Sequence, residues 1–92
     1  MKKITKEWLI SAEDDFEVIN KIIDAKHLTH RVAFHSQQAI EKCFKAVIEE
    51  FELGIIKIHD LETLFNKVEN YIHFKVEIET LKELDKLSLL TD

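Results

Sequence analysis

The sequence predicts an all-α protein, and three observations support this fold class. The 92-residue chain contains no proline and a single glycine, so almost nothing in it breaks a helix. Leu, Ile, Glu and Lys, which suit helices, are abundant. Apolar residues recur at spacings of three and four, the period of an amphipathic helix. A chain of this length fits one domain, residues 1–92. Because the links between the predicted helices are short, we expect an antiparallel up-and-down four-helix bundle.

Composition and charge narrow the class of protein. Hydrophobic residues make up 46% and charged residues 34% of the chain, too apolar for a disordered segment and too charged for a membrane-embedded one. Apolar runs are short, and no apolar stretch follows the basic start, so we expect a cytoplasmic protein. The net charge of −5 argues against nucleic-acid binding over the whole surface, so any RNA or nucleotide site has to be a local patch.

The first predicted helix runs from about Thr5 to Lys26. Its apolar stripe consists of Trp8, Ala12, Phe16, Ile19 and Ile23. We assign Trp8 and Phe16 to the core rather than to a platform on which bases stack. An acidic cluster on this helix is interpreted as a solvated face and consists of Glu13, Asp14, Asp15 and Glu17.

The second predicted helix, from roughly Thr29 to Leu53, carries two apolar stripes. The bulky stripe consists of Ala33, Gln37, Ile40, Phe44, Val47 and Phe51. The narrow stripe consists of Val32, Ser36, Ala39, Cys43 and Ala46. Small side chains let a neighbouring helix approach closely, so we expect this helix to be central and contacted from two sides. Gly54 suits a left-handed helix end, and Cys43 is interpreted as a small buried hydrophobe.

Two further helices are predicted after Gly54. The third begins at His59 or Asp60 and runs to about Tyr71, with Asp60 as its N-cap. Its apolar stripe consists of Leu61, Leu64, Phe65, Val68 and Ile72. The last helix begins at about Val76 and carries Ile78, Leu81, Leu84, Leu87 and Leu90. The apolar pattern is still running where the sequence stops, so we expect a bundle that is short at its C-terminal end.

Two segments, Phe34–Val47 and His59-Asp60-Leu61, resemble the signature of the HEPN family of small helical nucleotide-binding or RNase-type domains. The resemblance extends back to Trp8 and Ala12–Phe16. It implies a HEPN-like helical bundle. HEPN proteins generally continue beyond this point with a Tyr- and Arg-containing turn and a further helix, so the resemblance implies a short member of the family.

A polar stripe lies on the second helix, roughly opposite the bulky one. It consists of Arg31, His35, Gln38, Lys42 and Lys45. Arg and Lys can bind phosphate while His35 and Gln38 supply directional hydrogen bonds, the chemistry that a nucleotide or an RNA backbone needs. The alternative is an ordinary solvated face with a favourable pair of Glu41 and Lys45. We define these five residues as the polar stripe.

His59 and Asp60 match the family's His-Asp pair, and the resemblance adds them to a nucleotide- or partner-facing surface. The alternative is a helix cap beside a packed histidine. The RNase members of the family carry an Arg, four to six residues and then a His, whereas three residues separate Arg31 from His35. This pair therefore stays only a candidate for catalysis. No zinc pattern or glycine-rich loop is present, so we expect no metal and no cofactor.

The leading hypothesis from the resemblance is a nucleotide-binding or protein-interaction module that partners a minimal nucleotidyltransferase in a toxin–antitoxin-type pair. One alternative is a metal-independent endoribonuclease toxin, against which the missing Arg-to-His spacing argues. The other is a truncated domain with only a structural role. A homodimer is expected, because the apolar stripes of the second helix, together with Phe34 and Ile48 on a further side, exceed what one bundle face needs.

Overall fold

The computed structural model describes residues 1–54, 57, 60–72 and 78–88. Within these residues the regular elements are helical, and the four α-helices are α1 (Lys3–Ile22), α2 (Thr29–Glu50), α3 (Leu61–Val68) and α4 (Ile78–Ser88). Two short 3-10 helices accompany them, η1 (Lys26–Leu28) and η2 (Glu69–Tyr71). The all-helical class is confirmed, while the up-and-down bundle stays a prediction. Across these ranges we find no helix with the length and apolar character that crossing a membrane requires.

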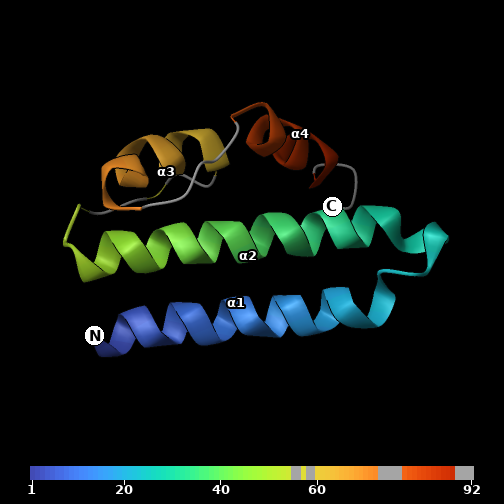
Figure 1. The fold of residues 1–92 in the computed structure, drawn as a ribbon, viewed down its shortest axis with the longest axis horizontal. Helices are drawn as coiled ribbons and strands as arrows, with labels where there is room; N and C mark the ends of the chain where they lie inside the picture. The colour runs from blue at the N-terminus through green and yellow to red at the C-terminus, as the bar shows by residue number, and fades with distance from the viewer. Residues whose placement is uncertain (55–56, 58–59, 73–77, 89–92) are drawn as a thin grey trace.

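The two long helices, α1 and α2, form an antiparallel hairpin, and α2 is the central element (Figure 1). At the open end of the hairpin the Lys2 backbone N–H donates to Glu50 Oε1 at 3.0 Å. Both α3 and α4 contact α2 on the side that faces away from α1. The prediction of a central second helix with neighbours on two sides is confirmed.

The apolar core lies between α2, α3 and α4. Its buried side chains are Phe44, Ile48, Leu61, Leu64, Phe65, Val68 and Leu81. On its other side α2 buries Ala39 and Ala46, and α1 buries Ala12. Because these side chains are small, the two long helices can approach closely, as the narrow stripe predicted. The bulky and the narrow stripe therefore meet different neighbours.

The helix starts and ends lie a few residues from the predicted positions. The first helix begins at Lys3 and ends at Ile22, because a turn and η1 occupy the link to α2. The predicted cap of α3 is confirmed, since Asp60 Oδ2 accepts from the Thr63 N–H at 3.0 Å and from its hydroxyl at 2.7 Å. Val76, the predicted start of the last helix, lies outside the described residues.

The end of α2 differs from the prediction in the residue that takes the left-handed conformation. The helix ends at Glu50, and Glu52 has a φ of 53°. The Leu53 N–H donates to the Ile48 carbonyl at 2.9 Å, the hydrogen bond that closes a Schellman-type helix end. Gly54, with a φ of 115°, belongs to the link that follows rather than to the helix end itself.

Three residues that we assigned to apolar stripes are exposed. Phe16 is 47%, Ile23 58% and Phe51 53% exposed, whereas Asp15 is only 7% exposed. Residues of an α-helix advance by about 100° each, so a contact face centred on Ala12 and Asp15 turns Phe16 outwards. The prediction of Phe16 as a core residue is therefore wrong, as is the prediction of Asp15 as a solvated side chain. Ile23 and Phe51 belong to the predicted apolar stripes but lie outside the core.

Candidate functional site

Most residues of the polar stripe are partly buried where α2 packs against its neighbours. Arg31 is exposed, whereas His35, Gln38, Lys42 and Lys45 are half-buried. The interpretation as an ordinary solvated face therefore does not hold for these four residues. Their polar groups have partners on α1 and α2, and these partners decide what each side chain can still bind.

Asp15 of α1 lies at the centre of the first polar cluster. Its Oδ1 is 2.9 Å from Nδ1 of His35, and its Oδ2 is 2.7 Å from Nζ of Lys42. The Lys42 ammonium also donates to the Ser11 carbonyl at 3.5 Å. The Asp15 side chain is only 10% exposed, so its charge is largely removed from water and needs these partners.

This contact fixes how His35 can act. An ionised carboxylate only accepts hydrogen bonds, so the ring carries its hydrogen on Nδ1, and Nε2 of the neutral ring is an acceptor. The ring also meets Phe34 edge-on, with centroids 5.2 Å apart. No hydrogen bond of Nε2 is found among the described residues, and the His35 side chain is 24% exposed. A carboxylate at Nδ1 thus orients the ring and leaves Nε2 for a ligand or a proton.

The second polar cluster surrounds Glu41, which is 6% exposed. Its Oε2 pairs with Nζ of Lys45 at 3.0 Å, so the predicted pair is confirmed. Its Oε1 accepts from the Gln37 amide at 3.1 Å, and the Gln37 oxygen accepts from the Gln38 amide at 2.9 Å. Lys45 also lies 5.2 Å from the centre of the Trp8 ring, in range for a cation–π contact.

Trp8 is half-buried beside this cluster. Its indole N–H is shielded from solvent, and no acceptor for it is found among the described residues. A shallow hollow of about 280 Å³ adjoins it and is lined by Ile4, Glu7, Trp8 and Ser11. Because Lys45 lies over the Trp8 ring, the ring is engaged within the fold rather than presented as an open stacking platform.

The N-terminus of α3 joins the second cluster through α4. The Leu61 N–H donates to Asp85 Oδ2 at 2.9 Å, and Asp85 is also hydrogen-bonded to the Gln37 side chain. Burial raises the pKa of the Asp85 carboxyl, and the charges of Asp60 and Glu41 add to this rise, while both hydrogen bonds oppose it. The carboxylates of Asp85 and Asp60 thus accept hydrogen bonds from two backbone N–H groups in the first turn of α3.

The predicted site residues therefore divide into three groups. Gln38 and Lys45 belong to the hydrogen-bond network of Glu41 and Gln37, which reaches the start of α3. His35 and Lys42 both contact Asp15. Arg31 is exposed and belongs to neither cluster. The cap reading of Asp60 is confirmed, and His59 lies outside the described residues. Cys43 is half-buried, and burial raises the pKa of its thiol, which lowers its reactivity. Among the described residues no group of side chains has the composition of a metal site.

Sequence reasoning missed Asp15, Asp85 and the polar role of Gln37. The signal for Asp15 is its spacing, because it follows Ala12 by three residues and precedes Ile19 by four, which places it on the buried face. Gln37 stood on an apolar stripe, where a polar side chain has to find a partner when buried. Nothing local marks Asp85, since its partners are on α2 and α3.

Comparison with known proteins gives the family. No curated protein and no solved structure shows significant similarity to the chain. A family model described as HEPN domain matches residues 5–92, which includes all four described α-helices except the first two residues of α1. This membership supports a module of nucleotide-binding or RNase type in general, and it agrees with the all-helical fold. The chain belongs to the HEPN domain family.

Proposed function

We propose that this HEPN domain binds a nucleotide or another phosphate-bearing ligand at the exposed end of the polar stripe, formed by Arg31, His35 and Gln38. The observation that carries the proposal is the hydrogen bond of Asp15 to His35 Nδ1 at 2.9 Å, which leaves Nε2 as the free ring atom. Arg31 is exposed and forms no ion pair within the described residues, so its guanidinium is available to a phosphate.

The other residues of the predicted site have supporting roles in this proposal. Lys42 and Lys45 are each paired with a carboxylate, and their side chains are 19% and 11% exposed. They therefore stabilise the polar clusters that hold His35 and Gln38 in place, and add less direct attraction for phosphate. Asp60 caps α3, and His59 remains part of the proposed surface as an expectation from the sequence.

Titration of the protein with a fluorescent ATP analogue, at two salt concentrations, tests this site. Arg31→Ala should weaken binding about tenfold or more, because a charge-assisted hydrogen bond contributes about 1.5–3 kcal/mol. His35→Ala should also weaken it, and Lys67→Ala, which changes an exposed residue of α3, is the matched control. Absence of binding at millimolar ligand, or equal losses in all three variants, would contradict the proposal and favour a domain with only a structural role.

We also propose that the domain acts in the cytoplasm as a homodimer and partners a minimal nucleotidyltransferase in a toxin–antitoxin-type pair. Family membership supports the partnership, and exposed apolar side chains on α1 support self-association. Native mass spectrometry of the protein isolated from its own cells tests this. A stoichiometric complex with a nucleotidyltransferase is expected, and a lone monomer would contradict both parts.

A second candidate function, endoribonuclease activity, is favoured by one specific observation. Arg31 lies one helical turn from an imidazole whose Nδ1 is held by a carboxylate, an arrangement that suits a general base. The purified protein should then cleave RNA, and His35→Ala should abolish cleavage. If cleavage by the natural protein does not exceed the background of this variant, the enzyme hypothesis is wrong.

A further inference from the structure

The side of α2 opposite the polar stripe is apolar. Lys45 follows Ser36 by nine residues and Val47 follows Gln38 by nine, and nine residues turn a helix by about 180°. We define the apolar face by seven residues. Leu9, Phe16 and the C-cap Ile23 belong to α1, and Ser36, Ile40, Cys43 and Val47 belong to α2. None of these seven residues is charged, as is typical of the centre of a protein interface, and the exposed Glu13, four residues after Leu9 and three before Phe16, lies at the edge of the face.

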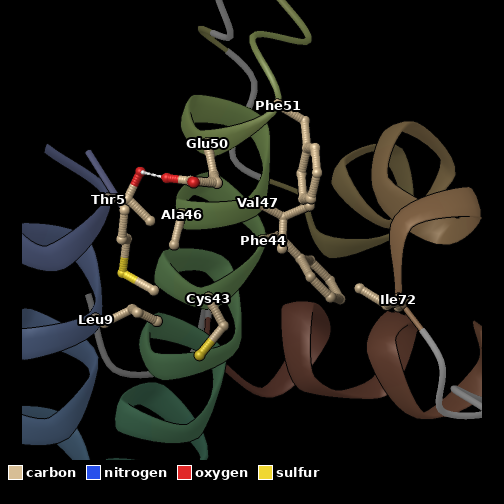
Figure 2. Close-up of a pocket in the computed structure, with 10 residues that line it drawn as sticks. Thr5, Leu9, Cys43, Phe44, Ala46, Val47, Glu50, Phe51 and Ile72 are labelled. Atoms are coloured by element: carbon tan, nitrogen blue, oxygen red, sulfur yellow. Dashed lines mark hydrogen bonds between the residues drawn. The ribbon is translucent and has the colours of Figure 1, made fainter.

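A hollow of about 390 Å³ lies at one end of this face (Figure 2). Its lining is Met1, Thr5, Leu9, Cys43, Phe44, Ala46, Val47, Glu50, Phe51 and Ile72. The Thr5 hydroxyl donates to Glu50 Oε1 at 3.0 Å. The backbone hydrogen bond from Lys2, together with this one from Thr5, lowers the pKa of Glu50. Since the polar lining groups already bind one another, the hollow suits an apolar side chain better than a polar metabolite.

Large apolar side chains protrude from the same face. Phe16 is 47% and Ile23 58% exposed, and both lie on the flank of α1 that carries Leu9. Phe16 follows Leu9 by seven residues, which returns it to the same side of the helix about 10 Å further along. Phe51 and Tyr71, 53% and 42% exposed with ring centroids 4.9 Å apart, extend the apolar surface beside the hollow.

We propose that the apolar face binds the same face of a second copy, with Phe16 of each copy inserted into the hollow of the other. A two-fold axis that lies in the plane of the face, perpendicular to α1 and midway between Leu9 and Phe16, places Phe16 of each copy over the hollow beside Leu9 of the other. Such an isologous contact requires the protrusion and the hollow to share one face, as they do here. The inference gives an interface to the homodimer of the proposed function and rests on it.

The size of the face suits a stable dimer. The apolar face covers one side of α1 and α2, two helices about 30 Å long and about 10 Å wide, so its projected area is about 600 Å². This lies at the lower end of the range of about 600–1,000 Å² that each partner buries in a standard interface. Because the polar stripe lies on the opposite side of α2, the dimer carries two separate polar stripes that point away from each other. Ligand binding then does not require dimerisation.

Sedimentation velocity over a concentration series from about 1 to 100 µM tests the interface. The natural chain should sediment as a dimer. Phe16→Glu should weaken self-association at least about 30-fold, the loss expected for an interface residue that contributes 2 kcal/mol or more. Ile10→Glu is the matched control, because Ile10 is 59% exposed on α1 and lies outside the apolar face. Both variants should keep the helical circular-dichroism spectrum, since each changes an exposed residue.

Three results would overturn the proposal: a natural chain that stays monomeric at the highest concentration, equal effects of both variants, or a partner of another sequence covering the face in the isolated complex. The nucleotide titration distinguishes this failure from failure of the proposed function. Phe16→Glu should bind the ATP analogue as the natural chain does, whereas Arg31→Ala should lose binding and still dimerise.

Discussion

Replacement of Asp15 by Ala should destabilise the protein far more than the same change at its neighbour Asp14. The Asp15 carboxylate is 2.9 Å from His35 and 2.7 Å from Lys42, and their side chains are 10%, 24% and 19% exposed. Removing one partner of a buried ion pair costs about 3–5 kcal/mol, and an exposed pair contributes about 0–1 kcal/mol. Because Lys42 and His35 retain some contact with water, we expect a loss of about 2–4 kcal/mol.

Thermal and urea unfolding followed by circular dichroism measure this loss. In a domain of this size 1 kcal/mol shifts Tm by about 4–8 °C, so Asp15→Ala should lower Tm by about 10–25 °C. Asp14→Ala should stay within about 0.5 kcal/mol, since Asp14 is exposed and no ion pair of it is found among the described residues. Because both variants replace Asp by Ala at adjacent positions of α1, the gain in helix propensity is the same in both and cancels when they are compared.

A second substitution separates the lost ion pair from lost packing. Lys42→Met removes the charge that Asp15→Ala leaves unpaired and keeps a long apolar side chain. The double variant should therefore recover at least about half of the stability lost by Asp15→Ala alone. The reasoning would be refuted if Asp15→Ala matched Asp14→Ala, or if Lys42→Met brought no recovery in the Asp15→Ala background.

Three further predictions concern single residues. Burial raises the pKa of Asp85, so the folded chain holds this proton more tightly than the unfolded chain, and stability falls as pH rises from the ordinary carboxyl range through the raised pKa. Asp85→Asn keeps an acceptor for the Leu61 N–H, and urea unfolding should show it to be more stable than the natural chain at pH 7 but not near pH 3. An equal difference in unfolding free energy between the two chains at both pH values would contradict this. Glu52→Gly should raise the unfolding free energy by about 0.5–1 kcal/mol, because glycine adopts a φ of 53° without strain. The control Glu49→Gly, inside α2, should lower it. A lower Tm for Glu52→Gly would show that the left-handed position carries no strain. Alkylation of Cys43 by iodoacetamide at pH 8 should be at least about tenfold slower in the folded than in the urea-unfolded chain, and equal rates would mean that burial does not protect the thiol.

Local sequence features determined the parts of this structure that depend on neighbours along the chain. The helical class, the N-cap at Asp60 and the pair of Glu41 with Lys45 all involve residues three or four positions apart. The two apolar stripes of α2 were likewise sufficient to predict a central helix with a neighbour on each side. The residues of the polar stripe were also identified from spacing alone, because helical periodicity fixes which side chains share a side.

The rotation of α1 about its own axis was decided only by tertiary contacts. Two faces of this helix, one with Phe16 and one with Asp15, lie about 100° apart, and apolar spacing favoured the first. The polar groups of α2 reverse the choice, because the Lys42 ammonium and the His35 ring face α1 and require a hydrogen-bonding partner when they are withdrawn from water.

The same contacts decided what the candidate site can do. The sequence placed five polar residues on one helix, but whether each is free to bind a ligand depends on carboxylates elsewhere in the fold. Asp15 on α1 holds His35 and Lys42, while Asp85 on α4 joins Gln37 to the start of α3. Such partners are distant along the chain and carry no local pattern, so only the packed arrangement of the helices could identify them.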